Sequence, residues 1–114
     1  MDDCIFCKII AHEIPGKIAF EDDLVIAFND IQPVAPVHIL VIPKKHIADM
    51  NEIKKQDEAL LGHLLLAVKL IAAEQGISEK GYRLIINTGP DSGQVVQHLH
   101  AHILGGQKLR HPMG

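Results

Sequence analysis

The chain has 114 residues, a length that suits one domain with a buried core and no need for disulfide bonds. Its formal charge of -3 argues against a long nucleic-acid groove, and no apolar run reaches the roughly 18 residues of a membrane span. The acidic start, Met1-Asp2-Asp3, differs from a signal peptide. We therefore expect one cytoplasmic domain over residues 1–114, whose cysteines are reduced thiols, metal ligands or redox groups.

Apolar periodicity predicts two helices and five strands. In chain order, we expect a helix at residues 4–13, strands at 17–21, 24–29 and 38–43, a helix at 56–75, and strands at 82–87 and 98–105. The first two strands flank Asp22-Asp23, which indicates a β-hairpin. The third strand, HILVIP, is a nearly continuous apolar run, typical of a strand buried on both faces. These segments favour an antiparallel sheet with helices packed on it, an α+β architecture.

The predicted long helix is apolar on nearly every side. Leu66, Ala67, Leu70 and Ala73 widen a stripe that already follows helical spacing, and Gly76 suits a C-terminal cap. A helix with so little polar surface usually buries a second side. In a protein of one domain, we expect another subunit to provide that second cover.

Three histidines alternate along the last predicted strand. His98, His100 and His102 would share one face, about 6.6 Å from one to the next at a rise of about 3.3 Å per residue. An ordinary solvent-facing strand would carry Thr, Lys, Glu or Ser instead. Two interpretations therefore compete: the imidazoles hold a catalytic zinc ion with an open position, or one of them attacks phosphorus as a nucleophile.

The loop before this strand favours phosphorus chemistry. Residues 87–94 (NTGPDSGQ) offer an amide side chain and unobstructed backbone N–H groups that can surround an anion. The same composition also forms ordinary turns, so the loop supports this interpretation only together with the histidines. A nucleotide-binding module without catalysis is a further alternative.

The segment HLHAHIL, residues 98–104, resembles the motif of the histidine-triad (HIT) family, in which histidine alternates with apolar residues. Further similarity to the Hint branch of this family lies in IPGK, FEDD, APVH, VIPKKH, LLGH and LGG, which cover nearly the whole chain. The Cys4–Cys7 pair resembles the bacterial type of Hint protein. The resemblance implies a HIT-like fold, an antiparallel five-stranded sheet with a short N-terminal helix and one long helix, and a sheet continued across a homodimer.

The resemblance also implies an activity. It is the hydrolysis of adenosine or guanosine 5′-phosphoramidates to a nucleoside monophosphate and an amine, through a nucleotidyl-histidine intermediate. His100 matches the family's nucleophile, His38 the histidine that supports it, and His102 the histidine that contacts phosphate and helps to protonate the leaving amine. No metal is implied for catalysis. The alternative within the family is hydrolysis of dinucleoside polyphosphates.

Eight positions match the family's substrate-binding residues. They are Phe28, Asn29, Asp30, Ile31, Asn87, Gly93, Gln94 and Val95. Asp30 matches the residue that holds the ribose hydroxyls, its neighbours the wall on the base side, and the last four the phosphate cradle, with the loop backbone as donor. Asp30 also suits closing the turn after Asn29. Val95 departs from a common serine, and His111 stands where animal members have tryptophan.

Cys4 and Cys7 are spaced to share one helix face and would supply half of a zinc site, with His46 and His98 as candidates for the rest. Many bacterial relatives have this arrangement and bind zinc, so the resemblance implies a structural zinc. The alternative is two free thiols packed as small apolar groups. The expected partners are thus a purine nucleotide and a second copy of the chain.

Overall fold

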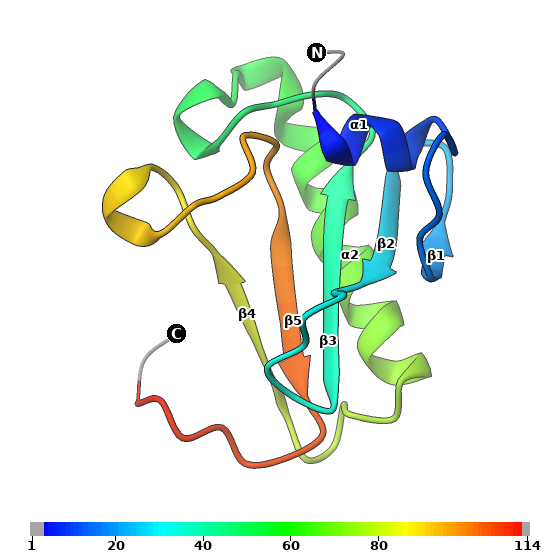
Figure 1. Cartoon of the computed structure of the whole chain (residues 1–114), viewed down its shortest axis with the longest axis vertical. Helices are drawn as coiled ribbons and strands as arrows, with labels where there is room; N and C mark the ends of the chain where they lie inside the picture. Colours follow the sequence, from blue (N-terminus) through cyan, green and yellow to red (C-terminus); the bar gives the residue numbers. More distant parts are fainter. Residues whose placement is uncertain (1–3, 113–114) are drawn as a thin grey trace.

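A computed structural model describes residues 4–112, which form a five-stranded antiparallel sheet with a helix on each face (Figure 1). The helices are α1 (Ile5–Ile10) and α2 (Glu58–Glu74), and the strands are β1 (Ile18–Glu21), β2 (Val25–Asn29), β3 (Val37–Pro43), β4 (Tyr82–Ile86) and β5 (Ala101–Gly105). The strands lie in the order β1-β2-β3-β5-β4, and every neighbouring pair is antiparallel. The predicted architecture is therefore confirmed.

The segment Met1-Asp2-Asp3, on which the expectation about a signal peptide rests, lies outside the described residues. Among residues 4–112, neither helix combines the length and the apolar character that crossing a membrane requires.

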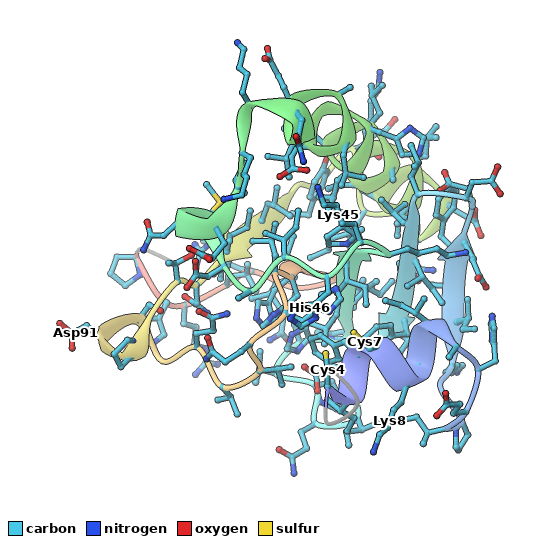
Figure 2. All side chains as sticks on the ribbon, turned by 90° about the horizontal axis from the view of Figure 1, so that it is seen from above. Cys4, Cys7, Lys8, Lys45, His46 and Asp91 are labelled. Carbon is cyan, nitrogen blue, oxygen red and sulfur yellow. The ribbon has the colours of Figure 1, made fainter. Side chains whose placement is uncertain are left out.

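The sheet has a core on each side, and β3 contributes to both. Ile39 and Val41 enter the core shared with α2, whereas Leu40 and Ile42 pack beneath α1. Figure 2 shows the two helices on opposite sides of the strands. This double burial is what the nearly continuous apolar run of β3 predicts, because side chains alternate between the faces of a strand.

Helix α1 is shorter than the predicted span of residues 4–13. It begins after Cys4, whose sulfur caps the helix by accepting a hydrogen bond from the N–H of Cys7 at 3.3 Å. Phe6 and Ile9 bury its inner face. His12 adopts a left-handed conformation with φ 59°, which ends the helical path.

Strand β5 begins at Ala101, three residues later than predicted. The preceding segment, residues 98–100, carries two of the alternating histidines in an irregular conformation. There the N–H of Leu99 donates to the carbonyl of Ile47 at 2.6 Å instead of joining the sheet. A residue whose backbone bonds to a partner outside the sheet does not continue the strand. His98 and His100 therefore do not follow the regular alternation of side chains along β5.

The tips of the sheet are held by side-chain contacts. In the β1–β2 hairpin, Oδ1 of Asp22 accepts hydrogen bonds from the N–H groups of Leu24 and Val25, both at 2.9 Å. Its Oδ2 lies 2.7 Å from Nε2 of His63 on α2. His63 thus ties the long helix to the hairpin.

The turn after β5 requires glycine at Gly106. Its φ is +90°, and a Cβ there would lie 2.9 Å from the Cβ of Pro36. This close approach packs the end of β5 against the loop that leads into His38.

Candidate functional site

His100 lies just before β5, with its ring buried against Phe6 of α1. The two ring centroids are 5.1 Å apart and meet edge to face. Nδ1 of His100 lies 2.7 Å from the carbonyl oxygen of His98, which can only accept, so Nδ1 carries the proton. Nε2 is then unprotonated and carries a lone pair. It has no hydrogen-bond partner in the described chain, where every buried side-chain nitrogen is partnered, so it reaches the surface and can act as a nucleophile.

His38 and His102 form a hydrogen-bonded pair beside His100. The N–H of Val34 donates to Nδ1 of His38 at 3.2 Å, so His38 carries its proton on Nε2. That N–H donates to Nδ1 of His102 at 3.0 Å. His102 therefore keeps its proton on Nε2, and its ring centroid lies 5.0 Å from that of His100. The site presents a lone pair on one imidazole and an N–H donor on its neighbour.

Both members of this pair are neutral at pH 7. Burial, helped by the neighbouring His100 and His38, lowers the pKa of His102 to about 4. Burial also lowers the pKa of His38. A carboxylate oxygen of Asp30 lies 3.4 Å from Nε2 of His38 and opposes both changes in pKa. His38 donates its hydrogen bond to His102, not to His100. Any effect of His38 on His100 therefore passes through His102.

The lowered pKa of His102 makes stability depend on pH. Because its folded pKa of about 4 is below the unfolded value near 6.5, the unfolded chain takes up the proton first as the pH falls. The free energy of unfolding should therefore fall from about pH 6.5 towards pH 4 and recover above pH 6.5. Part of the ring meets water, so we expect wild type to lose about 1 kcal/mol more than His102→Gln between pH 7 and pH 5 in urea unfolding. Equal losses would contradict this assignment.

A cavity of about 580 Å³ opens beside His38 and His102. It is also lined by Asn87, from the predicted phosphate cradle, and by Arg83 and Arg110. Arg83 and Asn87 share the face of His102 because they flank its register partner on β4. A cavity of this size suits a small-molecule ligand, and its guanidinium groups suit phosphate oxygens.

In the loop of the predicted phosphate cradle, the Gln94 side chain makes hydrogen bonds to the protein's own backbone. Gln94 is buried, its Oε1 accepts from the N–H of Gly89 at 2.9 Å, and its Nε2 donates to the carbonyl of Ala48 at 2.9 Å. Gly93 adopts a left-handed conformation with φ +86°. Val95 is 87% exposed and offers no polar side chain. The N–H groups of Gly93 and Gln94 also donate within the loop, to the carbonyls of Pro90 at 3.1 Å and Gly89 at 3.3 Å.

The remaining predicted substrate residues divide between buried and exposed positions. Phe28 is buried and packs edge to face on Phe6, with centroids 5.3 Å apart. Asn29 donates from Nδ2 to the carbonyl of Lys17 at 3.3 Å. Ile31 is 93% exposed, so its apolar surface is free to meet a ligand. The structure therefore joins Phe28 to the ring cluster around His100 and leaves Ile31 at the rim.

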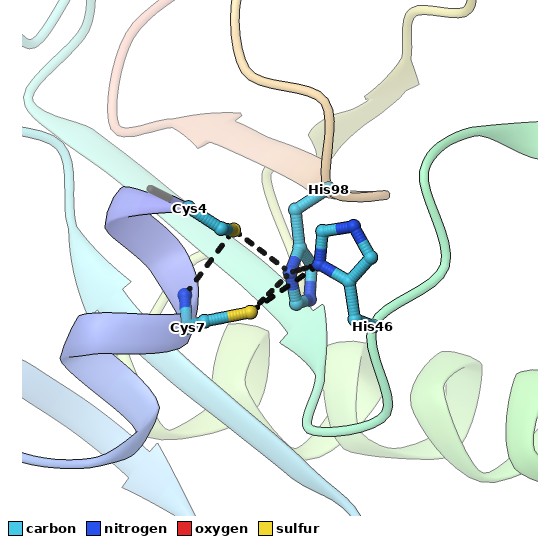
Figure 3. A group of neighbouring side chains, drawn as sticks. All are labelled: Cys4, Cys7, His46 and His98. Carbon is cyan, nitrogen blue, oxygen red and sulfur yellow. Dashed lines mark hydrogen bonds between the residues drawn. The ribbon is translucent and has the colours of Figure 1, made fainter. Parts of the chain in front are cut away.

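Cys4, Cys7, His46 and His98 converge at the end of α1 (Figure 3). The Cys7 sulfur lies 3.3 Å from Nδ1 of His46 and 3.6 Å from Nδ1 of His98, and the Cys4 sulfur lies 3.4 Å from the latter. The two Nδ1 atoms are 3.1 Å apart. All four ligand atoms lie within 4.8 Å of one another, close enough to bind a metal ion, as the spacing predicts.

The geometry of this cluster fits zinc. Zinc bonds of about 2.3 Å to sulfur and 2.0–2.1 Å to nitrogen, in a tetrahedron, separate two nitrogens by about 3.3 Å and sulfur from nitrogen by about 3.6 Å. Nε2 of His98 lies 2.8 Å from the carbonyl of Pro43 and so carries the proton, which turns the Nδ1 lone pair towards the cluster. Burial lowers the pKa of His98 and keeps the ring neutral, as a ligand must be.

The three alternating histidines do not gather around one ion. His98 belongs to the cysteine cluster, whereas His102 lies with His38 and Asp30, and within residues 4–112 no candidate ligand group contains both. The hydrogen bond between His38 and His102 and the ion-pair contact of Asp30 with His38 at 3.4 Å already account for the close approach of the second group. The interpretation in which His98, His100 and His102 together hold a catalytic zinc therefore finds no matching site.

Comparison with known proteins places this geometry in context. A profile of the HIT domain matches residues 11–109. The chain belongs to the HIT family. The resemblance identified from the triad motif is thus confirmed, and the Cys4–Cys7 pair fits the bacterial pattern.

Several HIT proteins are similar over almost the full chain. An uncharacterized HIT-like protein of Synechococcus elongatus is 59% identical over 113 residues, 99% of this chain and 98% of the relative. An Escherichia coli K12 protein named purine nucleoside phosphoramidase is 48% identical over 108 residues, 95% of this chain and 91% of the relative. A solved HIT family hydrolase from Legionella pneumophila has a TM-score of 0.95 at 47% identity, covering 98% of this chain and all (100%) of its own.

Two groups that shape this HIT site have no clear signal in the sequence. The N–H of Val34 orients His38, but a backbone donor is the same in every residue type except proline. Phe6 packs on His100, yet in the sequence it is only an apolar residue of a short helix. Arg83 has a recognisable signal, because it precedes Asn87 by four residues in the predicted strand 82–87 and would share its face.

Proposed function

We propose that this HIT protein is a hydrolase that cleaves nucleoside 5′-phosphoramidates into a nucleoside monophosphate and an amine. The observation that carries the proposal is the complementary pair of imidazoles, an accessible lone pair on His100 beside an N–H donor on His102. The name of the Escherichia coli relative supports the choice of a phosphorus–nitrogen bond. The Legionella structure, a HIT family hydrolase, supports the reaction class.

The proposed reaction has two steps. Nε2 of His100 attacks phosphorus, and the bond from phosphorus to the amine breaks with its electron pair leaving on nitrogen. His102 passes its Nε2 proton to that nitrogen as positive charge builds on the His100 ring. Water then attacks phosphorus and returns one proton to Nε2 of His102. The phosphorus–Nε2 bond breaks, and its electrons return to His100.

His38 has a positioning role in this scheme. Its Nε2–H holds Nδ1 of His102 at 3.0 Å, which keeps the transferable proton of His102 on the outward nitrogen. Val34 keeps His38 in the matching tautomer through its N–H. His38, His100 and His102 are therefore the proposed catalytic group.

The proposed substrate site surrounds this group. Asn87 and the backbone from Gly93 to Val95 would hold the phosphate, which the position of Asn87 in the cavity supports. Asp30 would bind the ribose hydroxyls, with Oδ1 already steadied by the N–H of Gln32 at 2.8 Å. The proposed purine would lie against a wall made of Phe28, Asn29 and Ile31.

We also propose that the cysteine cluster holds a structural zinc ion. Zinc bound there would fasten α1 and the loop of His46 to the segment before β5. Its ligands would be Cys4, Cys7, His46 and His98, as the sulfur and nitrogen spacings support. A cytoplasmic location, where thiols stay reduced, would suit this donor set.

The protein is further proposed to act as a homodimer whose sheets join. Strand β4 is at the edge of the sheet, and Tyr82 and Ile86 on it are exposed. The outer side of α2 exposes Leu65, Leu66 and Leu70. An unpaired strand edge beside an apolar helix face suits pairing with a second copy.

The proposed function is tested with adenosine 5′-phosphoramidate as substrate. We expect the wild-type protein to release AMP and ammonia, and rapid acid-free quenching with mass spectrometry to detect an adenylylated protein. A diadenosine polyphosphate serves as the competing substrate. Turnover of the polyphosphate alone would reassign the protein to dinucleotide hydrolysis. Tight AMP binding without turnover of either substrate would indicate a binding module.

A further inference from the structure

The cavity beside His38 and His102 occupies the part of the sheet that α1 leaves uncovered. Helix α1 packs on β2 and β3, whereas the cavity of about 580 Å³ extends over β4 and β5 on the same face. The C-terminal segment, red in Figure 1, passes the end of β4 and supplies Arg110 to the cavity wall. The space next to the proposed proton donor, His102, is therefore bounded by the sheet and by this segment.

Both arginines of the chain line this cavity. Of the 11 lysine and arginine residues, only Arg83 and Arg110 are arginines. Among residues 4–112, neither has an ion-pair partner, and no Asp or Glu lines the cavity. Arginine is always charged and presents a planar fork of N–H donors that matches a carboxylate or a phosphate. Two such groups without a counter-ion make the cavity suited to an anion.

A second cavity continues the basic lining. It has a volume of about 970 Å³, shares Arg83 with the first cavity, and adds Lys80 and Lys108. No acidic residue of the described chain lines it. The whole chain has a formal charge of -3, so this cationic surface is a local feature and does not reflect the composition. A cleft lined by one sign of charge concentrates ligands of the opposite sign.

The position of Arg83 places its charge on the side of the leaving amine. Ile85 is the register partner of His102, and Arg83 lies two residues before Ile85 on the same face, about 6.6 Å along β4. The proposed base and ribose residues, 28–31, do not line the cavity. The nucleoside would therefore lie outside the cavity, and the group that His102 protonates would face into it.

We propose that Arg83 and Arg110 are specificity-determining residues that bind an anionic group, a carboxylate or a phosphate, on the leaving amine. This inference rests on the proposed function, in which His102 protonates the leaving nitrogen. The preferred substrates are then nucleoside 5′-phosphoramidates whose amine carries a second anion. Arg83 is half-buried and Arg110 is exposed. Arg83 should contribute more, because water and salt screen an exposed charge.

The test compares adenosine 5′-phosphoramidates made with glycine, glycinamide and 2-aminoethyl phosphate. Glycine and glycinamide differ mainly in charge, and the third amine exchanges the carboxylate for a phosphate. In wild type we expect kcat/KM for the glycine conjugate to be about tenfold above that for the glycinamide conjugate, because a charge-assisted hydrogen bond replaces a neutral one. The larger of the two anionic preferences identifies whether carboxylate or phosphate is the better ligand.

Replacing Arg83 with glutamine should bring the ratio of glycine to glycinamide turnover within about twofold of one, and Arg110→Gln should lower it by a smaller factor. Lys69→Gln is the matched control, because it also removes one positive charge, from an exposed position on α2 across the sheet. It should keep the wild-type ratio. A wild-type ratio of one or less, or a ratio that Arg83→Gln leaves unchanged, would overturn the proposal. If Arg83→Gln does not fold, an unchanged ratio in Arg110→Gln would overturn it.

Binding to a variant without the proposed nucleophile separates this inference from the proposed function. In His100→Ala the conjugates stay intact, so calorimetry gives the Kd of each conjugate and of AMP. Adding Arg83→Gln to this variant should remove the preference for the glycine conjugate and change the Kd for AMP by about threefold or less, because AMP has no leaving amine. An equal loss of affinity for all ligands would place Arg83 on the reacting phosphate and overturn the proposal.

The two failures look different. Wild type that hydrolyses none of the conjugates, while His100→Ala binds the glycine conjugate about tenfold more tightly than the glycinamide conjugate through Arg83, would refute the function and support the anion site. Hydrolysis of the glycine and glycinamide conjugates with equal kcat/KM and equal Kd would support the function and refute the anion site.

Discussion

Replacing His100 with alanine is expected to abolish hydrolysis of adenosine 5′-phosphoramidate while AMP still binds. The variant loses the only lone pair that the ring cluster presents for attack, because Nδ1 of His102 is occupied by His38 and Nε2 of His102 carries a proton. Removing the nucleophile of a covalent mechanism typically costs several orders of magnitude, so we expect kcat to fall at least about a thousandfold. The proposed base and ribose contacts remain, and the Kd for AMP should change about threefold or less.

The measurement pairs ammonia release with AMP titration by calorimetry. His12→Ala is the matched control, because His12 is an exposed histidine whose Nε2 lies 3.3 Å from a carboxylate oxygen of Glu21. It should hydrolyse the substrate at the wild-type rate. Persistence of wild-type-like turnover in His100→Ala, or loss of turnover together with AMP binding, would refute the assigned role of His100.

Changing both cysteines to serine is expected to remove bound zinc and a large share of the stability. The change deletes the sulfur ligands and leaves Nδ1 of His46 and Nδ1 of His98 facing each other at 3.1 Å without a cation. A ligand that binds only the folded state stabilises it by about 3 kcal/mol at a hundred times its Kd. For a domain of this size that corresponds to a Tm lower by about 10–20 °C.

Zinc content and thermal unfolding are measured on the same preparations. Lys8→Ser is the matched control, because Lys8 lies on α1 but away from the cluster (Figure 2), so the helix receives the same new residue without losing a ligand. It should keep about one zinc per chain and nearly the wild-type Tm. Equal zinc content in the double-serine and wild-type proteins would contradict the metal assignment. His46→Asn tests it independently from a ligand outside α1.

The local pattern of the sequence predicts the elements of this fold well. The run HILVIP becomes β3, buried on both faces, because an apolar residue at every position suits a strand with a core on each side. The alternation in residues 101–104 likewise places Ala101 and Ile103 in the α2 core. These outcomes depend on neighbours along the chain, so periodicity is sufficient to predict them.

The ends of helices and strands and the partners of side chains depend instead on residues remote in the sequence. Residues 98–100 were expected to extend the last strand, but Leu99 bonds to Ile47 and the strand starts at Ala101. Ile47 lies about 50 residues before Leu99, so no local pattern indicates that its carbonyl competes with the sheet for the N–H of Leu99. The same holds for Gln94, whose side chain is used by Gly89 and Ala48 inside its loop.

Five strands, two helices, the HIT motif, and the cysteines and histidines of the candidate metal site all follow from the sequence alone. The tertiary structure was needed to show that the three alternating histidines divide between two clusters, with His98 turned to Cys4 and His102 to His38. It also decided the tautomers, because a backbone carbonyl and the N–H of Val34 assign each ring proton. The difference arises because residue type tells what a side chain can donate or accept, whereas its actual partner depends on distances between segments remote in the chain.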